Sequence, residues 1–497
     1  MTDTPPEEQE CQSRLAALEA QVRQDLAVIS HPRMEWLTPR VAPDGSQALD
    51  VLIVGGGQSG VATAFGLKRW RVDNVLVVDK APRGCEGPWR TYARMHTLRS
   101  PKDYTGPDLD IPSLTYPRWH VARFGESSWD QLELIPSELW ADYLLWVRDV
   151  TEVPVRSDTA VTGITPQDDG LLAAELSQSD GTVETVYARK IVLATGQDST
   201  GVWWMPADVA ALPTHRRAHA ADEIDFAQLA GKDVAVLGAG ASAFDNAATA
   251  LEAGARSVNL FCRRPMPQVI QPYRWLTFRG FLAHLGDLDD AWRWRFMRHI
   301  LGLREGFPQQ TLDRCTEHNN FRIVTGAPWH AVQDTEQMLR IETAKGVFTA
   351  DFIISGTGMD NDFAAKPELS AFAHNIATWA DCYTPPDSER DDRLARFPYL
   401  SNDYAFVEKV PGQTPWISDI HLFSISTTMS FGPSGSSINA MTTVVPKLVS
   451  AITKGLFRCD VDAHWASLEA YDVPQAILDE DLLERKQTKT AVSGDRR

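Results

Sequence analysis

Residues 51–60 read Val51-Leu52-Ile53-Val54-Gly55-Gly56-Gly57-Gln58-Ser59-Gly60, an apolar run that enters a Gly-x-Gly-x-x-Gly turn. The first glycine permits a tight strand-to-helix reversal, the second admits a pyrophosphate, and the third lets the helix pack against the strand. The helix then points free N–H groups and its positive dipole end at the phosphates. A second apolar strand ends at Asp79, where a carboxylate accepts hydrogen bonds from a ribose diol. These residues predict a βαβ dinucleotide site made by Gly55, Gly57, Gln58, Ser59, Gly60 and Asp79.

A second fingerprint lies later in the chain. Residues 233–243 read Asp233-Val234-Ala235-Val236-Leu237-Gly238-Ala239-Gly240-Ala241-Ser242-Ala243, with Ala243 in place of the third glycine, which the motif tolerates. We expect the cofactor to contact Gly238, Gly240, Ser242 and Ala243. After the next strand, no acidic residue corresponds to Asp79 of the first motif, and Arg263 and Arg264 follow instead. Guanidinium groups suit a phosphate dianion, which favours NADPH over NADH, although one of the two arginines is expected to be solvated surface.

Two further apolar strands end in glycine. Residues 191–196 end in Ala194-Thr195-Gly196 and residues 352–358 in Gly356-Thr357-Gly358, so the backbone at Thr195, Gly196 and Gly358 can approach a ligand. The fold class that follows is α/β, with two Rossmann-like dinucleotide-binding domains and the second inserted into the first. We expect a helical extension at 1–45, the first domain at 46–203 and 345–470, the second at 204–344, and a disordered tail at 485–497.

Two helical segments accompany these domains. Residues 10–29 hold apolar side chains at near-helical spacing, and this helix is expected to pack on its own domain, with a homodimer contact as the alternative. Residues 274–304 form a helical cap of the second domain, with a helix starting at Asp289-Asp290. Its clustered aromatic residues are expected to pack in the core, and lining a substrate pocket is the alternative.

Composition excludes several classes of protein. The chain has 497 residues and a net charge of −18, which argues against nucleic acid and anionic membranes as partners. Its N-terminus has neither a basic nor an apolar stretch typical of a signal peptide, and no window of about 20 apolar residues could span a bilayer. The six cysteines are scattered, so we expect no disulfide framework, no metal site and no redox-active pair, and a cytoplasmic location.

The two fingerprints, the Ala194-Thr195-Gly196 strand end and the stretch Gly87-Pro88-Trp89-Arg90 together resemble the class B flavoprotein monooxygenases. This group includes the flavin-containing monooxygenases, the YUCCA-type enzymes, the microbial N-hydroxylases and the Baeyer–Villiger monooxygenases. The resemblance covers residues 48–455. It implies FAD in the first domain, NADPH in the second, and a flavin C4a-(hydro)peroxide that delivers one oxygen atom of O2 to a small organic substrate.

The resemblance also places the segment around Trp89 and Arg90 over the flavin. His96, Arg99 and Lys102 follow on this segment and are the candidate catalytic residues. His96 could move a proton near neutral pH or serve as a structural hydrogen-bonder, whereas Arg99 and Lys102 could bind phosphate or cofactor. A loop of small residues that includes Ser436 and Asn439 opens a late helix, and its N–H groups would suit the negatively charged edge of reduced flavin. A helix cap formed by Ser434 or Ser436 is the alternative.

The reaction class stays open at this point. The Baeyer–Villiger signature is absent, since only His219 of its positions is present, and Pro213, His215 and Glu223 occupy the others. The main prediction is an NADPH-dependent FAD monooxygenase acting on an N, S or C centre. One alternative is a flavin-dependent oxidoreductase without oxygen insertion, and another is a non-catalytic FAD-binding protein. The intact second fingerprint counts against the last, because such a protein needs no hydride donor.

Overall fold

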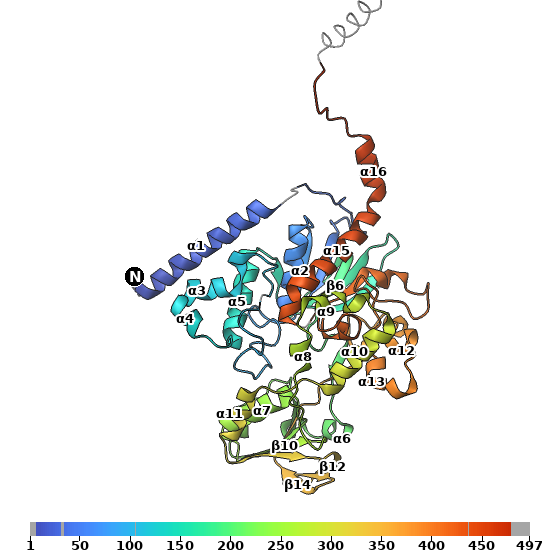
Figure 1. The fold of residues 1–497 in the computed structure, drawn as a ribbon. Helices are drawn as coiled ribbons and strands as arrows, with labels where there is room; N and C mark the ends of the chain where they lie inside the picture. The colour runs from blue at the N-terminus through green and yellow to red at the C-terminus, as the bar shows by residue number, and fades with distance from the viewer. Residues whose placement is uncertain (1–5, 31–33, 105, 436, 479–497) are drawn as a thin grey trace, which may run out of the picture.

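The computed structural model describes residues 6–30, 34–104, 106–435 and 437–478, and Figure 1 shows their arrangement. The predicted tail at 485–497 lies outside these residues. Two separate sheets with parallel cores organise the described chain, and each contains the strand that leads into one of the two glycine loops. The α/β fold with two Rossmann-like units is therefore confirmed.

The first sheet has the strand order β3-β2-β1-β6-β5-β4, with β17 beside the carboxyl end of β6. Its strands are β1 (Leu49–Val54), β2 (Val75–Val78), β3 (Val155–Arg156), β4 (Thr159–Pro166), β5 (Leu172–Gln178), β6 (Val183–Leu193) and β17 (Ile420–Leu422). In the parallel register, Val54 pairs with Val78 and with Leu193. The glycine loop, Asp79 and Thr195 therefore leave the sheet at the same edge, where ligands of open α/β sheets bind.

Helices pack on this sheet and beside it. They are α1 (Pro6–Ile29), α2 (Gln58–Arg69), α3 (Tyr116–Phe124), α4 (Glu126–Gln131), α5 (Ser137–Val150) and α15 (Met441–Cys459). Helix α2 packs closely on α15, since a Cβ at Gly66 would lie 2.9 Å from Val449. Helix α1 packs on α3: Val22 is fully buried, and the Arg14 Nε donates to the Ala122 carbonyl (2.9 Å). The N-terminal helix thus packs on its own domain, as its pattern predicted.

The second sheet is parallel, with the order β11-β10-β9-β15-β8. Its strands are β8 (Arg217–His219), β9 (Asp233–Leu237), β10 (Ser257–Cys262), β11 (Phe321–Thr325) and β15 (Phe352–Ser355), and a meander of β12 (Trp329–Asp334), β13 (Leu339–Thr343) and β14 (Gly346–Ala350) packs beside it. Helices α6 (Ala207–Ala210), α7 (Ala241–Glu252) and α11 (Gln309–Thr316) complete this unit. The expected boundary at 344 needs correction, because β14 and β15 continue the unit to Ser355. Strand β15 pairs with β8 and β9, and the order of the segments along the chain does not reveal this pairing.

The chain first enters the second unit and finally leaves it at neighbouring places, and between them residues 272–303 return to the first unit. Strands β7 (Gly201–Trp203) and β16 (Met359–Asn361) pair antiparallel, and a Cβ at Gly201 would lie 2.0 Å from the Asp360 carbonyl oxygen. The second unit is therefore an insertion attached by two paired connections. Figure 1 shows it at the bottom of the view, below the first unit.

The cap segment also needs correction. Its helices are α8 (Pro272–Trp275), α9 (Arg279–His284) and α10 (Asp290–Leu303), and α10 begins as predicted, with Asp289 accepting the Trp292 N–H (2.9 Å). Instead of covering the second domain, its buried residues Phe281, Trp294 and Met297 join the core of the first. Four short helices lie in the returning chain: α12 (Trp379–Cys382), α13 (Asp392–Ala395), α14 (Thr428–Phe431) and α16 (Val461–Glu469). Along the described ranges, no helix has both the length and the apolar content that crossing a bilayer requires.

Candidate functional site

The glycines of the first glycine loop have two different roles: two of them allow close backbone packing, and one leaves space for a ligand. Gly55 has φ +111°, and a Cβ there would lie 2.3 Å from the Ala194 carbonyl oxygen. A Cβ at Gly60 would lie 1.8 Å from the Gly55 oxygen. Gly57 differs, because its nearest neighbour would be the Gly87 nitrogen at 3.9 Å. Gly55 and Gly60 are thus required by the fold itself, whereas Gly57 leaves open the space that a pyrophosphate would approach.

Asp79 holds this loop in place. Its Oδ2 accepts the Gly56 N–H (2.7 Å) and its Oδ1 accepts the Ala81 N–H (2.8 Å). Burial raises the pKa of Asp79, although both backbone hydrogen bonds oppose the shift. Each carboxylate oxygen keeps a second lone pair, so a hydrogen bond from a ribose hydroxyl is compatible with these contacts and stays a prediction.

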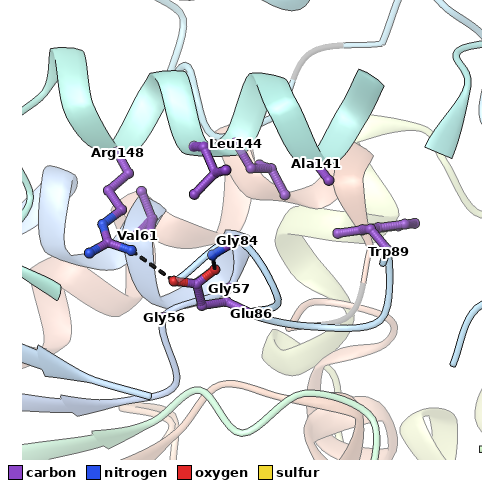
Figure 2. Close-up of a pocket in the computed structure, with 10 residues that line it drawn as sticks. Gly56, Gly57, Val61, Gly84, Glu86, Trp89, Ala141, Leu144 and Arg148 are labelled. Carbon is purple, nitrogen blue, oxygen red and sulfur yellow. Dashed lines mark hydrogen bonds and ion pairs between the residues drawn. The ribbon is translucent and has the colours of Figure 1, made fainter. Parts of the chain in front are cut away.

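A small pocket opens between this loop and helix α5 (Figure 2). Gly56 and Gly57 form its floor with Val61, α5 contributes Ala141, Leu144, Leu145 and Arg148, and Gly84, Glu86 and Trp89 complete the lining. The predicted residue Trp89 therefore lines the same pocket as the glycine loop, at its other end (Figure 2). Arg90 instead forms an ion pair with Asp142 and lies outside the lining.

Glu86 and Arg148 in this pocket escaped the sequence analysis. Glu86 Oε1 accepts from an Arg148 guanidinium nitrogen (2.7 Å), and Oε2 accepts the Gly84 N–H (2.7 Å). The two side chains are only 6% and 9% exposed, and burial lowers the pKa of Arg148. Because 62 positions separate them in the chain, no local pattern could have paired them.

Two buried polar atoms beside the loop have no hydrogen-bond partner among the described residues, Gln58 Oε1 and Asn439 Oδ1. Gln58 begins α2 directly after Gly57, and Asn439 lies in the turn before α15. That turn is tied to α2, since the Ser59 hydroxyl donates to the Gly435 carbonyl (2.9 Å). An open glycine and two orphaned polar atoms fit a ligand that brings its own donors, as a flavin dinucleotide does.

The loop before α15 differs from the helix cap considered above. The helix begins at Met441, and the Ser434 hydroxyl pairs with Thr427 Oγ1 (2.8 Å) rather than capping it. Ser436 lies outside the described residues. Gly196, with φ +74°, accepts the N–H of Ile425, which begins the turn at 425–427, and Thr427 of that turn pairs with Ser434 of the loop.

The second glycine loop has the same geometry as the first, and Gly356 makes room for the alanine that replaces its third glycine. Gly238 has φ +116°, and a Cβ there would lie 2.4 Å from the Gly356 oxygen, whereas a Cβ at Gly240 would meet nothing within 4 Å. The methyl group of Ala243 is accommodated because Gly356 faces it: a Cβ at Gly356 would lie 2.7 Å from the Ala243 Cβ. Ser242 is exposed at the start of α7. Gly358, with φ +81°, accepts the Trp204 N–H (2.9 Å) within the paired connections.

The two arginines after β10 have different surroundings. Arg264 donates to the carbonyls of Gly302 (2.7 Å) and Leu303 (3.3 Å) and so anchors the end of α10, whereas Arg263 is exposed. Desolvation lowers the pKa of Arg304 to about 10, and the charges of Arg393, Arg263 and Arg264 add to the shift. Four positive charges from separate parts of the chain thus converge at the end of β10. The sequence analysis missed Arg304 and Arg393, which lie far from the fingerprint.

None of the three candidate catalytic residues lines the pocket beside Gly57. His96 is exposed, with its Nε2 3.8 Å from Glu252 Oε2 on α7. Arg99 binds Asp245 (2.6 Å) and Glu305 (3.0 Å), so phosphate binding would require one of these ion pairs to break. Lys102 donates to the Trp129 carbonyl (2.8 Å) and lies 4.6 Å above its ring. The described residues contain no cluster of His, Cys, Asp and Glu able to hold a metal, and all six cysteines are free.

Comparison with known proteins identifies the group to which this architecture belongs. A family model described as pyridine nucleotide-disulphide oxidoreductase matches residues 52–277. The chain is also 38% identical, over 459 residues, to the FAD-dependent urate hydroxylase of Xanthomonas campestris pv. campestris, and the match spans 92% of this chain and 95% of that protein. The chain belongs to this family of FAD-dependent hydroxylases.

Solved structures at much lower sequence identity show the same fold. The ornithine N-hydroxylase of Kutzneria sp. 744 superposes with a TM-score of 0.63 at 16% identity, covering 82% of this chain and 99% of that one. The cadaverine monooxygenase of Erwinia amylovora gives 0.60 at 14% identity, covering 87% and 98%. These structures show a shared fold, and membership in the family of FAD-dependent hydroxylases supports the flavin monooxygenase that the sequence resemblance implied.

Proposed function

We propose that this monooxygenase hydroxylates urate or a closely related purine. The overall reaction consumes one urate, one O2, one NADPH and one proton, and it yields hydroxylated urate, water and NADP+. The observation that carries the proposal is the 38% identity to a urate hydroxylase along 92% of the chain. The amine N-hydroxylases share only 14–16% identity, a level that supports the common fold and carries no substrate with it.

The chain's own residues supply binding, orientation and shielding. We propose that Gly57, Gln58, Thr195, Gly196 and Asn439 contact FAD, with the N-terminus of α2 directed at its pyrophosphate. Gly240, Ser242 and the N-terminus of α7 would hold NADPH in the same way, and Arg263 would bind its 2′-phosphate. When bound, FAD accepts a hydride from NADPH and activates O2. The chain's part is to bring the two glycine loops together across the connections at β7 and β16.

The roles of the remaining candidates are narrower than the sequence suggested. His96 stays a candidate for proton movement, since it is exposed on the segment between the two domains. Arg99 and Lys102 are proposed to have structural roles, because carboxylates and a backbone carbonyl already occupy their charged groups. The free cysteines support the cytoplasm, a reducing compartment, as the location.

The substrate is tested by presenting urate, xanthine and ornithine separately to the purified holoenzyme with NADPH and O2. Urate should accelerate NADPH oxidation and lose its ultraviolet absorbance in step with the NADPH consumed, with little hydrogen peroxide formed. Ornithine should leave the slow basal rate unchanged. Acceleration by ornithine without any effect of urate would overturn the proposed substrate while leaving the monooxygenase assignment intact.

A further inference from the structure

Residues 94–99 contact both domains, and we call this segment the strap. On one side the strap is fixed to the first domain: the Leu98 N–H donates to the Ile135 carbonyl (2.7 Å), and the Ser137 N–H donates to the His96 carbonyl (3.0 Å). The Leu98 side chain is 2% exposed and belongs to the first core. Upstream, the same segment begins at Trp89 in the wall of the pocket. The strap is therefore part of the flavin-binding domain.

The other side of the strap contacts the NADPH domain. The Arg94 guanidinium donates to the Asp222 carbonyl (3.2 Å), and the Arg94 carbonyl accepts from Arg314 (3.2 Å) on α11. His96 lies 3.8 Å from Glu252 on α7. The Thr97 hydroxyl donates to Gln310 (3.4 Å), also on α11.

The most buried of these contacts joins Arg99 to Asp245. Asp245 is 4% exposed and lies in the second turn of α7, the helix whose N-terminus follows the NADPH glycine loop. It accepts from Arg99 (2.6 Å) and from the Thr311 hydroxyl (2.9 Å), and Arg314 lies 3.7 Å away. Burial lowers the pKa of Arg99, but the charges of Glu305 and Asp245 outweigh it and hold that pKa above its ordinary value.

We propose that Asp245 is a positioning residue for hydride transfer, because through Arg99 it fixes the NADPH-binding helix against the flavin-binding domain. Neither residue lines the pocket beside Gly57. Their contact is the most buried of the strap contacts, and together with the other strap contacts and the pairing of β7 with β16 it sets the distance and angle between the two dinucleotide sites. A displacement of about 1 Å in such an arrangement can slow a reaction roughly a hundredfold.

The test uses Asp245→Asn, Arg99→Gln and the double variant in the FAD-loaded protein. Asp245→Asn keeps the size of the side chain and its ability to accept from Thr311. Asp233→Asn is the matched control. Asp233 also pairs with an arginine of the same domain, Arg256 (2.7 Å), but it lies at the start of β9, whereas the NADPH glycine loop follows the end of that strand. Anaerobic mixing with NADPH gives the rate constant of flavin reduction, and titration with NADP+ gives its dissociation constant.

We expect flavin reduction to slow by about tenfold to a hundredfold in both single variants, while the NADP+ dissociation constant stays within about twofold. Both substitutions remove the Arg99–Asp245 contact, and Arg99→Gln also removes the ion pair with Glu305, so the double variant should be no slower than Arg99→Gln. Wild-type reduction rates, or single effects that multiply in the double variant, would overturn the proposal.

A second readout does not depend on turnover. In cofactor-free Asp245→Asn protein, amide hydrogen exchange should increase in peptides covering residues 94–99 and α7 but stay at the wild-type level in β9 and β10. An increase throughout the NADPH domain, with weaker NADP+ binding, would instead show that the substitution only destabilises that domain and would overturn the positioning role.

Discussion

Exchanging Gly57 for alanine separates ligand access from protein packing. Gly57 has φ −73° and ψ −171°, a conformation that alanine adopts without strain, and the new methyl group would lie 3.9 Å from the nearest protein atom. The apoprotein should therefore stay within about 1 kcal/mol of the wild type, because the less flexible unfolded chain favours alanine while the N-cap position of α2 favours glycine. The methyl group would occupy the space that the account gives to the FAD pyrophosphate.

The binding penalty follows from the same geometry. Displacing the pyrophosphate from the loop weakens hydrogen bonds to a charged group, each worth about 1.5–3 kcal/mol, so FAD affinity should fall by roughly tenfold to a hundredfold. The assay is titration of apoprotein with FAD, followed by flavin fluorescence, alongside thermal unfolding of the apoprotein.

Gly240→Ala is the matched control, because Gly240 has φ −83° and ψ 172°, and a methyl group added there would meet nothing within 4 Å. It should leave FAD affinity unchanged and raise the KM for NADPH. Unchanged FAD affinity in Gly57→Ala, or FAD loss in Gly240→Ala, would refute the assignment of the two loops. Gly60→Ala should prevent proper folding, since its methyl group would lie 1.8 Å from the Gly55 oxygen.

Three further predictions rest on charge. Arg263→Gln should raise the KM for NADPH by roughly tenfold to a hundredfold and leave the KM for NADH unchanged, and equal effects on both coenzymes would argue against a 2′-phosphate contact. Glu86→Gln should destabilise the protein by about 3–5 kcal/mol in thermal or urea unfolding, because it leaves the Arg148 charge buried without its partner, and combining it with Arg148→Met should recover part of the loss. Burial and the charge of Lys190 lower the pKa of His421 to about 4, so the unfolded chain takes up this proton first as the pH falls below about 6.5. Wild-type protein should thus lose about 3 kcal/mol more stability between pH 6.5 and 4 than His421→Gln, and parallel pH profiles would contradict this.

The sequence predicted the elements whose signals are local. Both glycine loops, the strands before them and Asp79 lie where the pattern placed them, because a strand, a turn and a helix are encoded within about thirty neighbouring residues. The start of α10 was equally readable, since Asp289 caps it within one turn.

Contacts between distant segments were not predictable in this way. Glu86 pairs with Arg148, and Gly356 leaves room for Ala243, only after the chain has folded. Arg99 appeared to be a phosphate ligand because its sequence neighbours follow the flavin-covering stretch, and the partner that redefines it, Asp245, lies on another domain. The cap was assigned to the wrong domain for the same reason, since its aromatic residues do not reveal which core they enter.

The measurement that tests the central claim most directly is the fate of isotopically labelled oxygen. The holoenzyme is supplied with NADPH, urate and 18O2, and the products are analysed by mass spectrometry together with the O2 consumed and any hydrogen peroxide formed. The account predicts one labelled oxygen atom in hydroxylated urate for each NADPH oxidised. Recovery of the consumed oxygen as hydrogen peroxide, with no label in any organic product for urate or other purines, would contradict it.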